Sequence, residues 1–405
     1  MRRQQLFSVL VLVLLAGVAG QGSAAEFDPA KLAVIRQKMQ RYVDEHVVSG
    51  AVTVIGNKNG IAIIDAVGQL NIEGQTAMPK DALFRIASMT KPITAMGIMI
   101  LEQEKKLSVT DPVAKYLPDF AGQKLVLSRE GGNVKLGDPT RPITIRDLLT
   151  HTSGLPGGFP APHGELYFKR NLTLKEAVDV SAKQPLDFEP GSRWAYCNAG
   201  IDALGRIIEV VSGQSYENFL AARIFAPLGM LDTTFYPTDE QLKRLAGLYE
   251  VKDGKLKYIA YQLLGPTKDA KHPIPAGGLY STAEDLGRLY QLMLHRGSIG
   301  QLRILTDHSA VEMAKLQTGL LECGFTPGMG WGYGWAVVHR PAGVHSMLSA
   351  GSYGHGGAFG TQGWIDPHQD LFVILLIQRV GLQNADGSDL RRDLQQVAVD
   401  ARKKP

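Results

Sequence analysis

The chain has 405 residues, of which 44% are hydrophobic and 20% are charged, and this composition is typical of one large globular domain or of two closely packed ones. The formal net charge of +4 is too small to indicate nucleic acid or an anionic membrane surface as a partner. The 10 histidines are scattered and form no zinc-binding pattern such as His-Glu-x-x-His, so we predict no metal ion and no cofactor.

Residues 1–25 are predicted to be a secretory signal peptide. Arg2 and Arg3 precede an apolar run from Leu6 to Val18, and the small residues 22–25 lead to Glu26. This order of charged, apolar and cleavable segments is typical of an export signal, and the apolar run is too short to span a bilayer comfortably. We therefore expect an exported protein, periplasmic or secreted, without a stable membrane anchor after cleavage; an uncleaved anchor is the alternative.

Strand patterns are found toward both ends of the chain. After a helix predicted at 29–47, two β-rich runs flank the hairpin turn 57–60, and four further runs near the C-terminus are separated by glycine and proline. The predicted strands are Ala51–Ile55, Ile61–Val67, Tyr333–His339, Ser346–Ala350, Gly360–Asp366 and Leu371–Gln378.

The middle of the chain is predicted to be mostly helical, because apolar residues recur there at intervals of three and four. The predicted helices are Lys91–Glu104, Ile145–Leu149, Leu174–Lys183, Ala199–Val211 and Ala283–His295. Two polar segments rich in glycine or proline, Gly122–Arg141 and Leu155–Gly164, are predicted to be loops at the rim of a cleft.

This order of elements predicts an α/β fold of the α+β type, in which both chain ends build one antiparallel sheet flanked by helices. Residues 26–87 and 276–405 would form the sheet-containing domain. Residues 88–275 would form an inserted, mostly helical region, and the active site would lie between the two.

The first candidate catalytic element is Ser88-Met89-Thr90-Lys91. It leads directly into the apolar stretch 93–101, so Ser88 lies near a helix start and Lys91 lies one turn further along the same face. A serine hydroxyl needs a nearby base, and a desolvated lysine amine can lose its proton far below its usual pKa. The Ser-x-x-Lys pattern alone is weak, because a helix cap and a surface lysine would explain it equally well.

The second element is the segment Phe188–Asn198, a turn followed by an extended stretch. Residues two apart in an extended segment point the same way, so Tyr196 and Asn198 can address one cleft. A tyrosine hydroxyl can relay a proton, and an asparagine amide can donate and accept at a substrate. Another Tyr-x-Asn match, Tyr216 to Asn218, lies in a helical pattern where such side chains diverge, so we choose Tyr196.

The third element is the glycine-rich segment Gly354–Gly360. Its glycines allow a ligand to approach the backbone closely, and backbone N–H groups there can face a developing oxyanion. His355 could orient or bind the substrate.

These three elements, in this order, resemble the signature of class C serine β-lactamases, DD-peptidases and β-lactamase-like carboxylesterases. Three further segments are similar to the same penicillin-recognising group: Ile143–Leu155, Phe225–Thr234 and Ala276–Leu286. The resemblance covers about residues 30 to 380, and it implies a β-lactamase/transpeptidase-like fold.

The resemblance also implies the role of each site residue. Ser88 would be acylated, with Lys91 and Tyr196 sharing the general-base and general-acid work in an order that the sequence leaves open. The backbone N–H groups of Ser88 and Ala358 would form the oxyanion hole, and Asn198 would hold the acyl side of the substrate. His355, Gly356 and Gly357 would line the substrate-binding strand.

One departure from the family pattern concerns the third element, which in β-lactamases is commonly Lys-Thr-Gly. Here it is His355-Gly356-Gly357, with no hydroxyl and with an imidazole that is mostly neutral at pH 7. These changes remove groups expected to hold the carboxylate of a penicillin or of a peptide C-terminus. Esters or amides without a carboxylate therefore become the favoured substrates, and Gly356→Thr is expected to shift the preference toward anionic ones.

The sequence thus predicts an exported serine hydrolase that acts through an acyl-enzyme on a small ester or amide. A DD-peptidase or a β-lactamase acting on β-lactams is the alternative within the family. A penicillin-recognising sensor without turnover is the non-enzymatic alternative, although an activated nucleophile would serve no purpose in it. The oligomeric state is left open.

Overall fold

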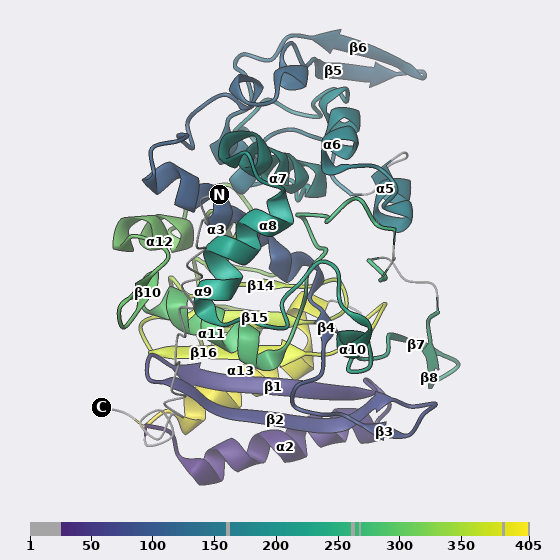
Figure 1. The fold of residues 1–405 in the computed structure, drawn as a ribbon, viewed down its shortest axis with the longest axis vertical. Helices are drawn as coiled ribbons and strands as arrows, with labels where there is room; N and C mark the ends of the chain where they lie inside the picture. Colours follow the sequence, from purple (N-terminus) through teal and green to yellow (C-terminus); the bar gives the residue numbers. More distant parts are fainter. Residues whose placement is uncertain (1–25, 159–162, 261–263, 267–268, 383–384, 404–405) are drawn as a thin grey trace, which may run out of the picture.

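The chain is built around one eight-stranded sheet to which both ends of the sequence contribute (Figure 1). The structure is a computed structural model, and it describes residues 26–158, 163–260, 264–266, 269–382 and 385–403. In spatial order, the strands are β12 (Met329–Trp331), β13 (Ala336–Val338), β14 (Tyr353–Gly356), β15 (Gln362–Asp366), β16 (Leu371–Leu376), β1 (Gly50–Asn57), β2 (Gly60–Asn71) and β3 (Thr76–Ala77). Every neighbouring pair is antiparallel.

The two ends of the chain meet where β1 pairs with β16, with Val54 opposite Ile374. β1 is rich in β-branched residues and is buried along its whole length, which is typical of a central strand covered on both faces. The predicted antiparallel sheet made from both chain ends is confirmed.

Alternate residues of β1 enter two different hydrophobic clusters, because successive side chains of a strand point to opposite faces. Val52 and Val54 pack into the cluster that contains α11 (Ala283–Leu294) and α3 (Thr90–Gln103). Ala51 and Ile55 pack into the cluster that contains α2 (Pro29–Asp44) and α13 (Asp389–Ala401). The sheet therefore lies between two helical layers.

Helix α3 is the central helix of the molecule. All its residues from Thr90 to Leu101 are buried, as expected of a helix that is apolar on every side. Gly97 permits close packing of α7 (Asn198–Ser212), because a Cβ there would lie only 2.7 Å from Ile208. The remaining helices are α4 (Ile145–Leu149), α5 (His163–Lys169), α6 (Leu174–Ala182), α8 (Tyr216–Leu220), α9 (Ala226–Leu228), α10 (Asp239–Leu242) and α12 (Asp307–Ala314).

Four short two-stranded sheets complete the structure. They are formed by β4 (Phe84–Arg85) with β9 (Tyr280–Ser281), β5 (Leu125–Glu130) with β6 (Asn133–Gly137), β7 (Tyr249–Lys252) with β8 (Lys255–Tyr258), and β10 (Ser298–Ile299) with β11 (Leu302–Arg303). The β4–β9 pair holds the segment before Ser88 next to the segment after Ala276.

The predicted loop at 122–141 was wrong, since it contains the β5–β6 hairpin. Gly131 and Gly132 form its turn, both with positive φ (55° and 84°), as a tight hairpin turn requires. Most side chains of this hairpin are exposed, so no buried face imposes the alternation by which a strand is recognised in a sequence.

Two predicted strands near the C-terminus also need correction. The segment 333–339 forms a strand only from Ala336 to Val338, because a turn through Gly334, with φ of 75°, precedes it. The segment 346–350 is not a strand: a 3-10 turn at Gly343–His345 leads into it, and the Leu348 N–H donates to His345 O at 3.0 Å. Local turn bonds thus replace sheet pairing there.

In the part of the chain that the structure describes, no helix is long and apolar enough to cross a membrane. The predicted signal peptide, residues 1–25, lies outside the described residues. The predicted domain boundaries after residues 87 and 275 stay a prediction.

Candidate active site

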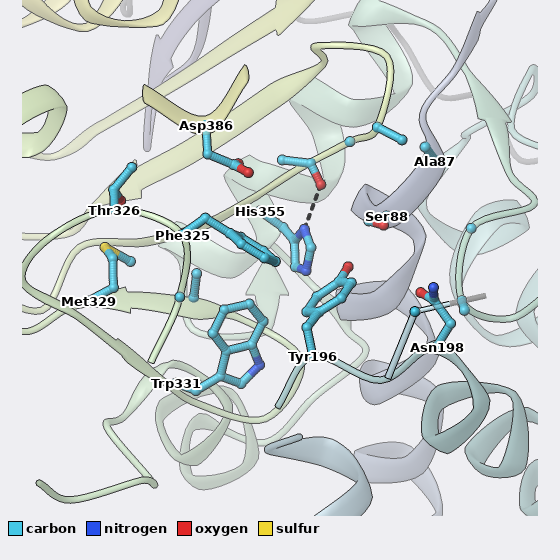
Figure 2. A pocket seen from close by; sticks show the side chains of 18 of the residues that line it. Ala87, Ser88, Tyr196, Asn198, Phe325, Thr326, Met329, Trp331, His355 and Asp386 are labelled. Atoms are coloured by element: carbon cyan, nitrogen blue, oxygen red, sulfur yellow. Dashed lines mark hydrogen bonds between the residues drawn. The ribbon is translucent and has the colours of Figure 1, made fainter. Parts of the chain in front are cut away.

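The three sequence elements meet around one cavity of about 270 Å³ (Figure 2). Seven of the eight predicted site residues line it: Ser88, Tyr196, Asn198, His355, Gly356, Gly357 and Ala358. The eighth, Lys91, is fully buried beneath Ser88. Most of the remaining wall is apolar or aromatic, including Leu264, Phe325, Met329, Trp331 and Trp364. A mainly apolar cavity with a few convergent polar groups is typical of a small-molecule site.

Ser88 is held at the start of the central helix by the strand that precedes it. The Ile86 N–H donates to Leu279 O at 3.0 Å, and a 3-10 turn at Ala87–Met89 then leads into α3. Ala87 has a φ of 46°, a conformation that costs a non-glycine residue of order 1 kcal/mol or more. This strained residue directly precedes Ser88, whose side chain remains partly exposed at the cavity.

Lys91 lies within reach of the Ser88 hydroxyl. Its Nζ is 2.9 Å from Ser88 Oγ and donates to Ala276 O at 2.6 Å. Burial lowers the pKa of Lys91 to about 7, while the carboxylate of Asp202 acts in the opposite direction. A large fraction of this amine is therefore neutral at neutral pH, which is the form that can accept a proton.

Tyr196 stands on the other side of Ser88. Its ring lies 4.7 Å from Lys91 Nζ, and its hydroxyl interacts with the Ser88 side chain. Burial raises the pKa of Tyr196 far above its ordinary value of 10, and the bond to Ser88 only partly opposes this effect. Tyr196 is therefore a protonated phenol that can donate to a leaving group.

The turn that carries Tyr196 and Asn198 is held by His151, a residue that the sequence analysis did not single out. The Cys197 N–H donates to His151 Nδ1 at 3.2 Å, and the imidazole stacks on Tyr196 with centroids 4.6 Å apart. Asn198 is the first residue of α7 and lines the cavity. His151, which lies in the segment 150–153, thus orients the second element, Phe188–Asn198.

The other Tyr-x-Asn match is placed away from the cavity. Tyr216 is fully buried in α8, and its hydroxyl lies 2.6 Å from Thr94 Oγ1. It does not line the cavity.

The third element approaches Ser88 through glycine backbone. A Cβ on Gly357 would overlap Thr361 Oγ1 and the carbonyl of Ile86, so only glycine permits this approach. The Gly357 N–H donates to Thr361 O at 2.7 Å, and the Gly360 N–H donates to Gly357 O at 2.9 Å. These bonds form the turn that places Ala358 at the cavity.

The predicted effect of Gly356→Thr stays a prediction, and the structure shows that the side chains of Asp386 and Gln362 would have to move to admit the new side chain. A Cβ on Gly356 would overlap Asp386 Oδ1 and Gln362 Nε2. A carboxylate therefore occupies the space into which a side chain at position 356 would project. Asp386 comes from a segment 30 residues further along the chain, and the sequence did not point to it.

Asp202 is a third residue that sequence reasoning missed. It lies on α7 and accepts from the Ala276 N–H at 2.9 Å and from the Tyr167 hydroxyl. Burial raises the pKa of Asp202 to about 6, although both bonds and Lys91 favour the carboxylate. Because Ala276 O in turn accepts from Lys91, Asp202 positions the carbonyl that orients the Lys91 amine.

Among the described residues, no group of three or more histidine, cysteine, aspartate or glutamate side chains could hold a metal ion. Both cysteines, Cys197 and Cys323, are buried and unpaired with each other.

Comparisons with known proteins agree with this geometry. The family model described as Beta-lactamase matches residues 35–398. Protein Rv1367c of Mycobacterium tuberculosis is 32% identical over 83% of this chain and 87% of its own length. Esterase EstB of Burkholderia gladioli is 28% identical over 87% of this chain and 94% of its own length.

Among solved structures, "EstCE1, a hydrolase with promiscuous acyltransferase activity" superimposes with a TM-score of 0.75 at 26% identity, covering 92% of this chain and 98% of its own. More distant sequence matches include putative D-alanyl-D-alanine carboxypeptidases. The chain therefore belongs to the β-lactamase family, as a hydrolase with esterase and DD-peptidase relatives.

Proposed function

We propose that this protein is an exported carboxylesterase that cleaves small esters through an acyl-enzyme on Ser88. The observation that carries the proposal is the fully buried Lys91 amine 2.9 Å from Ser88 Oγ, because a hydroxyl becomes a useful nucleophile only beside a base of suitable pKa. The esterase relatives support the same reaction class.

In the first step, neutral Lys91 accepts the Ser88 proton as Oγ attacks the ester carbonyl. The pKa of Lys91, about 7, favours this residue as the first base, since burial holds the pKa of Tyr196 far above 10 and leaves almost no phenolate. Negative charge then develops on the carbonyl oxygen. The backbone N–H groups of Ser88 and Ala358 are the donors that would stabilise it.

In the second step, the C–O bond breaks and the leaving alkoxide takes a proton from the Tyr196 hydroxyl, which protonated Lys91 replenishes. The acyl group stays on Ser88 Oγ. A water molecule, deprotonated by the same Lys91–Tyr196 pair, then attacks the acyl carbonyl. The bond between the acyl carbon and Ser88 Oγ breaks, the acid is released, and the pair returns the proton to Ser88 Oγ.

Three features favour esters without a carboxylate over β-lactams and peptides. The cavity wall is mainly apolar or aromatic, the third element has no hydroxyl, and the carboxylate of Asp386 stands beside Gly356. A β-lactam or a D-Ala-D-Ala peptide would bring its own carboxylate to this part of the site.

The test compares kcat/KM for p-nitrophenyl butyrate, a chromogenic cephalosporin and a D-Ala-D-Ala peptide, with Ser88→Ala as control. We expect efficient ester hydrolysis that the control lacks. Faster hydrolysis of the cephalosporin or the peptide would refute the carboxylesterase assignment in favour of a β-lactamase or a DD-peptidase. Export is tested separately by the mature N-terminus, expected at Glu26.

A further inference from the structure

Two hydrogen-bond acceptors lie in or beside the third element at the cavity, and the first of them is the carboxylate of Asp386. Asp386 lines the cavity, and its Oδ1 accepts from Gln362 Nε2 at 3.0 Å. Because a Cβ at Gly356 would overlap Oδ1, this carboxylate lies directly beside the strand on which a substrate would be held.

The second acceptor is His355. Its Nδ1 lies 2.6 Å from Gly356 O, and a carbonyl oxygen can only accept, so Nδ1 carries the proton and Nε2 presents a lone pair. Burial and the charge of Lys91 lower the pKa of His355 to about 3, which keeps the ring from taking a second proton. In the described part of the chain, Nε2 is buried and has no hydrogen-bond partner, so His355 adds neither a positive charge nor a free donor that would attract an anion.

Arg391 also lines the cavity, but its guanidinium is directed toward protein groups. Arg391 is 2% exposed and lies 3.9 Å from the centre of the Trp364 ring. It donates to Asp386 O and, at 3.0 Å, to Gln395 Oε1, and it contacts His345 Nδ1 at 2.8 Å. Its guanidinium therefore stabilises the backbone at Asp386 and has few N–H donors left for a substrate anion.

We propose that Asp386 sets the charge selectivity of this enzyme: substrates carry a cationic group, such as an ammonium, beside Gly356, and carboxylates are rejected. A cation there would pair with Asp386, whereas an anion would meet a like charge. Like charges placed side by side at a recognition site strongly disfavour the wrong partner. This inference rests on the proposed esterase activity.

The experiment uses two series of esters that differ only in one charge. The first series has p-nitrophenyl butyrate, 4-aminobutyrate and hemisuccinate, with the charge on the acyl side. The second has butyrate esters of butanol, choline and 3-hydroxypropionate, with the charge on the alcohol side. Each series is measured on the wild type, on Asp386→Asn, and on Asp389→Asn, which removes an equal charge from an exposed position outside the cavity.

In at least one series, the wild type should prefer the cationic ester. Asp386→Asn should lower the cation-to-anion ratio of kcat/KM by about tenfold or more, the change expected from removing one nearby charge. The neutral ester and the Asp389→Asn control should change far less. An unchanged ratio in both series would overturn the inference, and so would a wild type that prefers the anionic esters, because Arg391 would then be the substrate-binding charge.

Failure of the esterase proposal has a different signature, namely no hydrolysis of any ester that depends on Ser88. In that case, the binding of small ions to the site tests the inference. Titration of the Ser88→Ala protein with butylammonium and with butyrate should show tighter binding of the cation, and the additional Asp386→Asn substitution should abolish the difference. Equal affinity for the two ions before that substitution would contradict the role of Asp386.

Discussion

Replacing Lys91 with methionine should abolish ester hydrolysis and at the same time stabilise the fold at neutral pH. Methionine fills a similar volume but cannot accept a proton from Ser88. The stabilisation follows from burial, which holds the pKa of Lys91 at about 7 against 10.5 for an exposed lysine. Below pH 10.5 the unfolded chain binds a proton at this residue, whereas the folded chain binds one only below about pH 7.

The sign and size of the effect follow from that difference. As the pH falls from 10.5 to 7, Lys91 increasingly favours the unfolded state, at about 1.36 kcal/mol per pH unit. At pH 7.5 the buried lysine therefore lowers the free energy of unfolding by about 4 kcal/mol. Methionine removes this cost but leaves Ala276 O without its donor, a loss of about 1–3 kcal/mol. The net gain for Lys91→Met at pH 7.5 is therefore about 1–3 kcal/mol.

The assay is urea unfolding of the wild type and of Lys91→Met between pH 7.5 and 9.5, with the exposed Lys183→Met as control. The advantage of Lys91→Met should shrink by about 2.5 kcal/mol over this range, because the unfolded lysine approaches its own pKa. The control should show no such trend. A Lys91→Met protein that is less stable than the wild type by the same amount at every pH would refute the reasoning, since Lys91 would then be charged in the folded state.

Further outcomes follow from the same geometry. Ser88→Ala should lower turnover by more than about a thousandfold, while urea unfolding changes by no more than about 1 kcal/mol. Tyr196→Phe should lower kcat by about a hundredfold or more. Tyr216→Phe should change the kinetics very little, because the Tyr216 hydroxyl lies 2.6 Å from the buried Thr94 Oγ1, and equal effects of the two substitutions would contradict the choice of Tyr196. Asp202→Asn should move the acid limb of the kcat/KM profile to lower pH, because the carboxylate raises the pKa of Lys91, and an unmoved limb would remove Asp202 from the positioning of that amine. Gly357→Ala should lower the free energy of unfolding by about 1–3 kcal/mol and remove much of the activity, because the new Cβ would overlap Thr361 and Ile86. A Gly357→Ala protein with wild-type activity and melting temperature would show that the turn has more room than the structure indicates.

Much of the site could be predicted because its candidate residues lie close together in three short segments of the sequence. Ser88 and Lys91 lie one helical turn apart, so the spacing in the sequence already fixes their proximity once the helix forms. Tyr196 and Asn198 likewise share one short segment, and both line the cavity. The sheet could be predicted for a similar reason, since its buried strands carry strong apolar patterns at both ends of the chain.

The errors occurred where the local pattern was weak. The hairpin at 125–137 has mostly exposed side chains, so no buried face left an alternation in its sequence. The segment 346–350 has residues that suit a strand, but turn bonds such as the one from Leu348 to His345 satisfy its backbone instead. Neither outcome can be worked out from neighbouring residues alone.

The sequence by itself predicted the helix that joins Ser88 to Lys91 and the pairing of the two chain ends in one sheet, and it indicated the groups that we propose to react. Only the tertiary structure decided the environment of those groups. Asp202 reaches Lys91 through Ala276, and Asp386 reaches Gly356 from a segment 30 residues away. The pKa of Lys91 and the negative charge beside Gly356 depend on burial and on residues that long-range packing brings together. Both conditions arise only when the chain has folded.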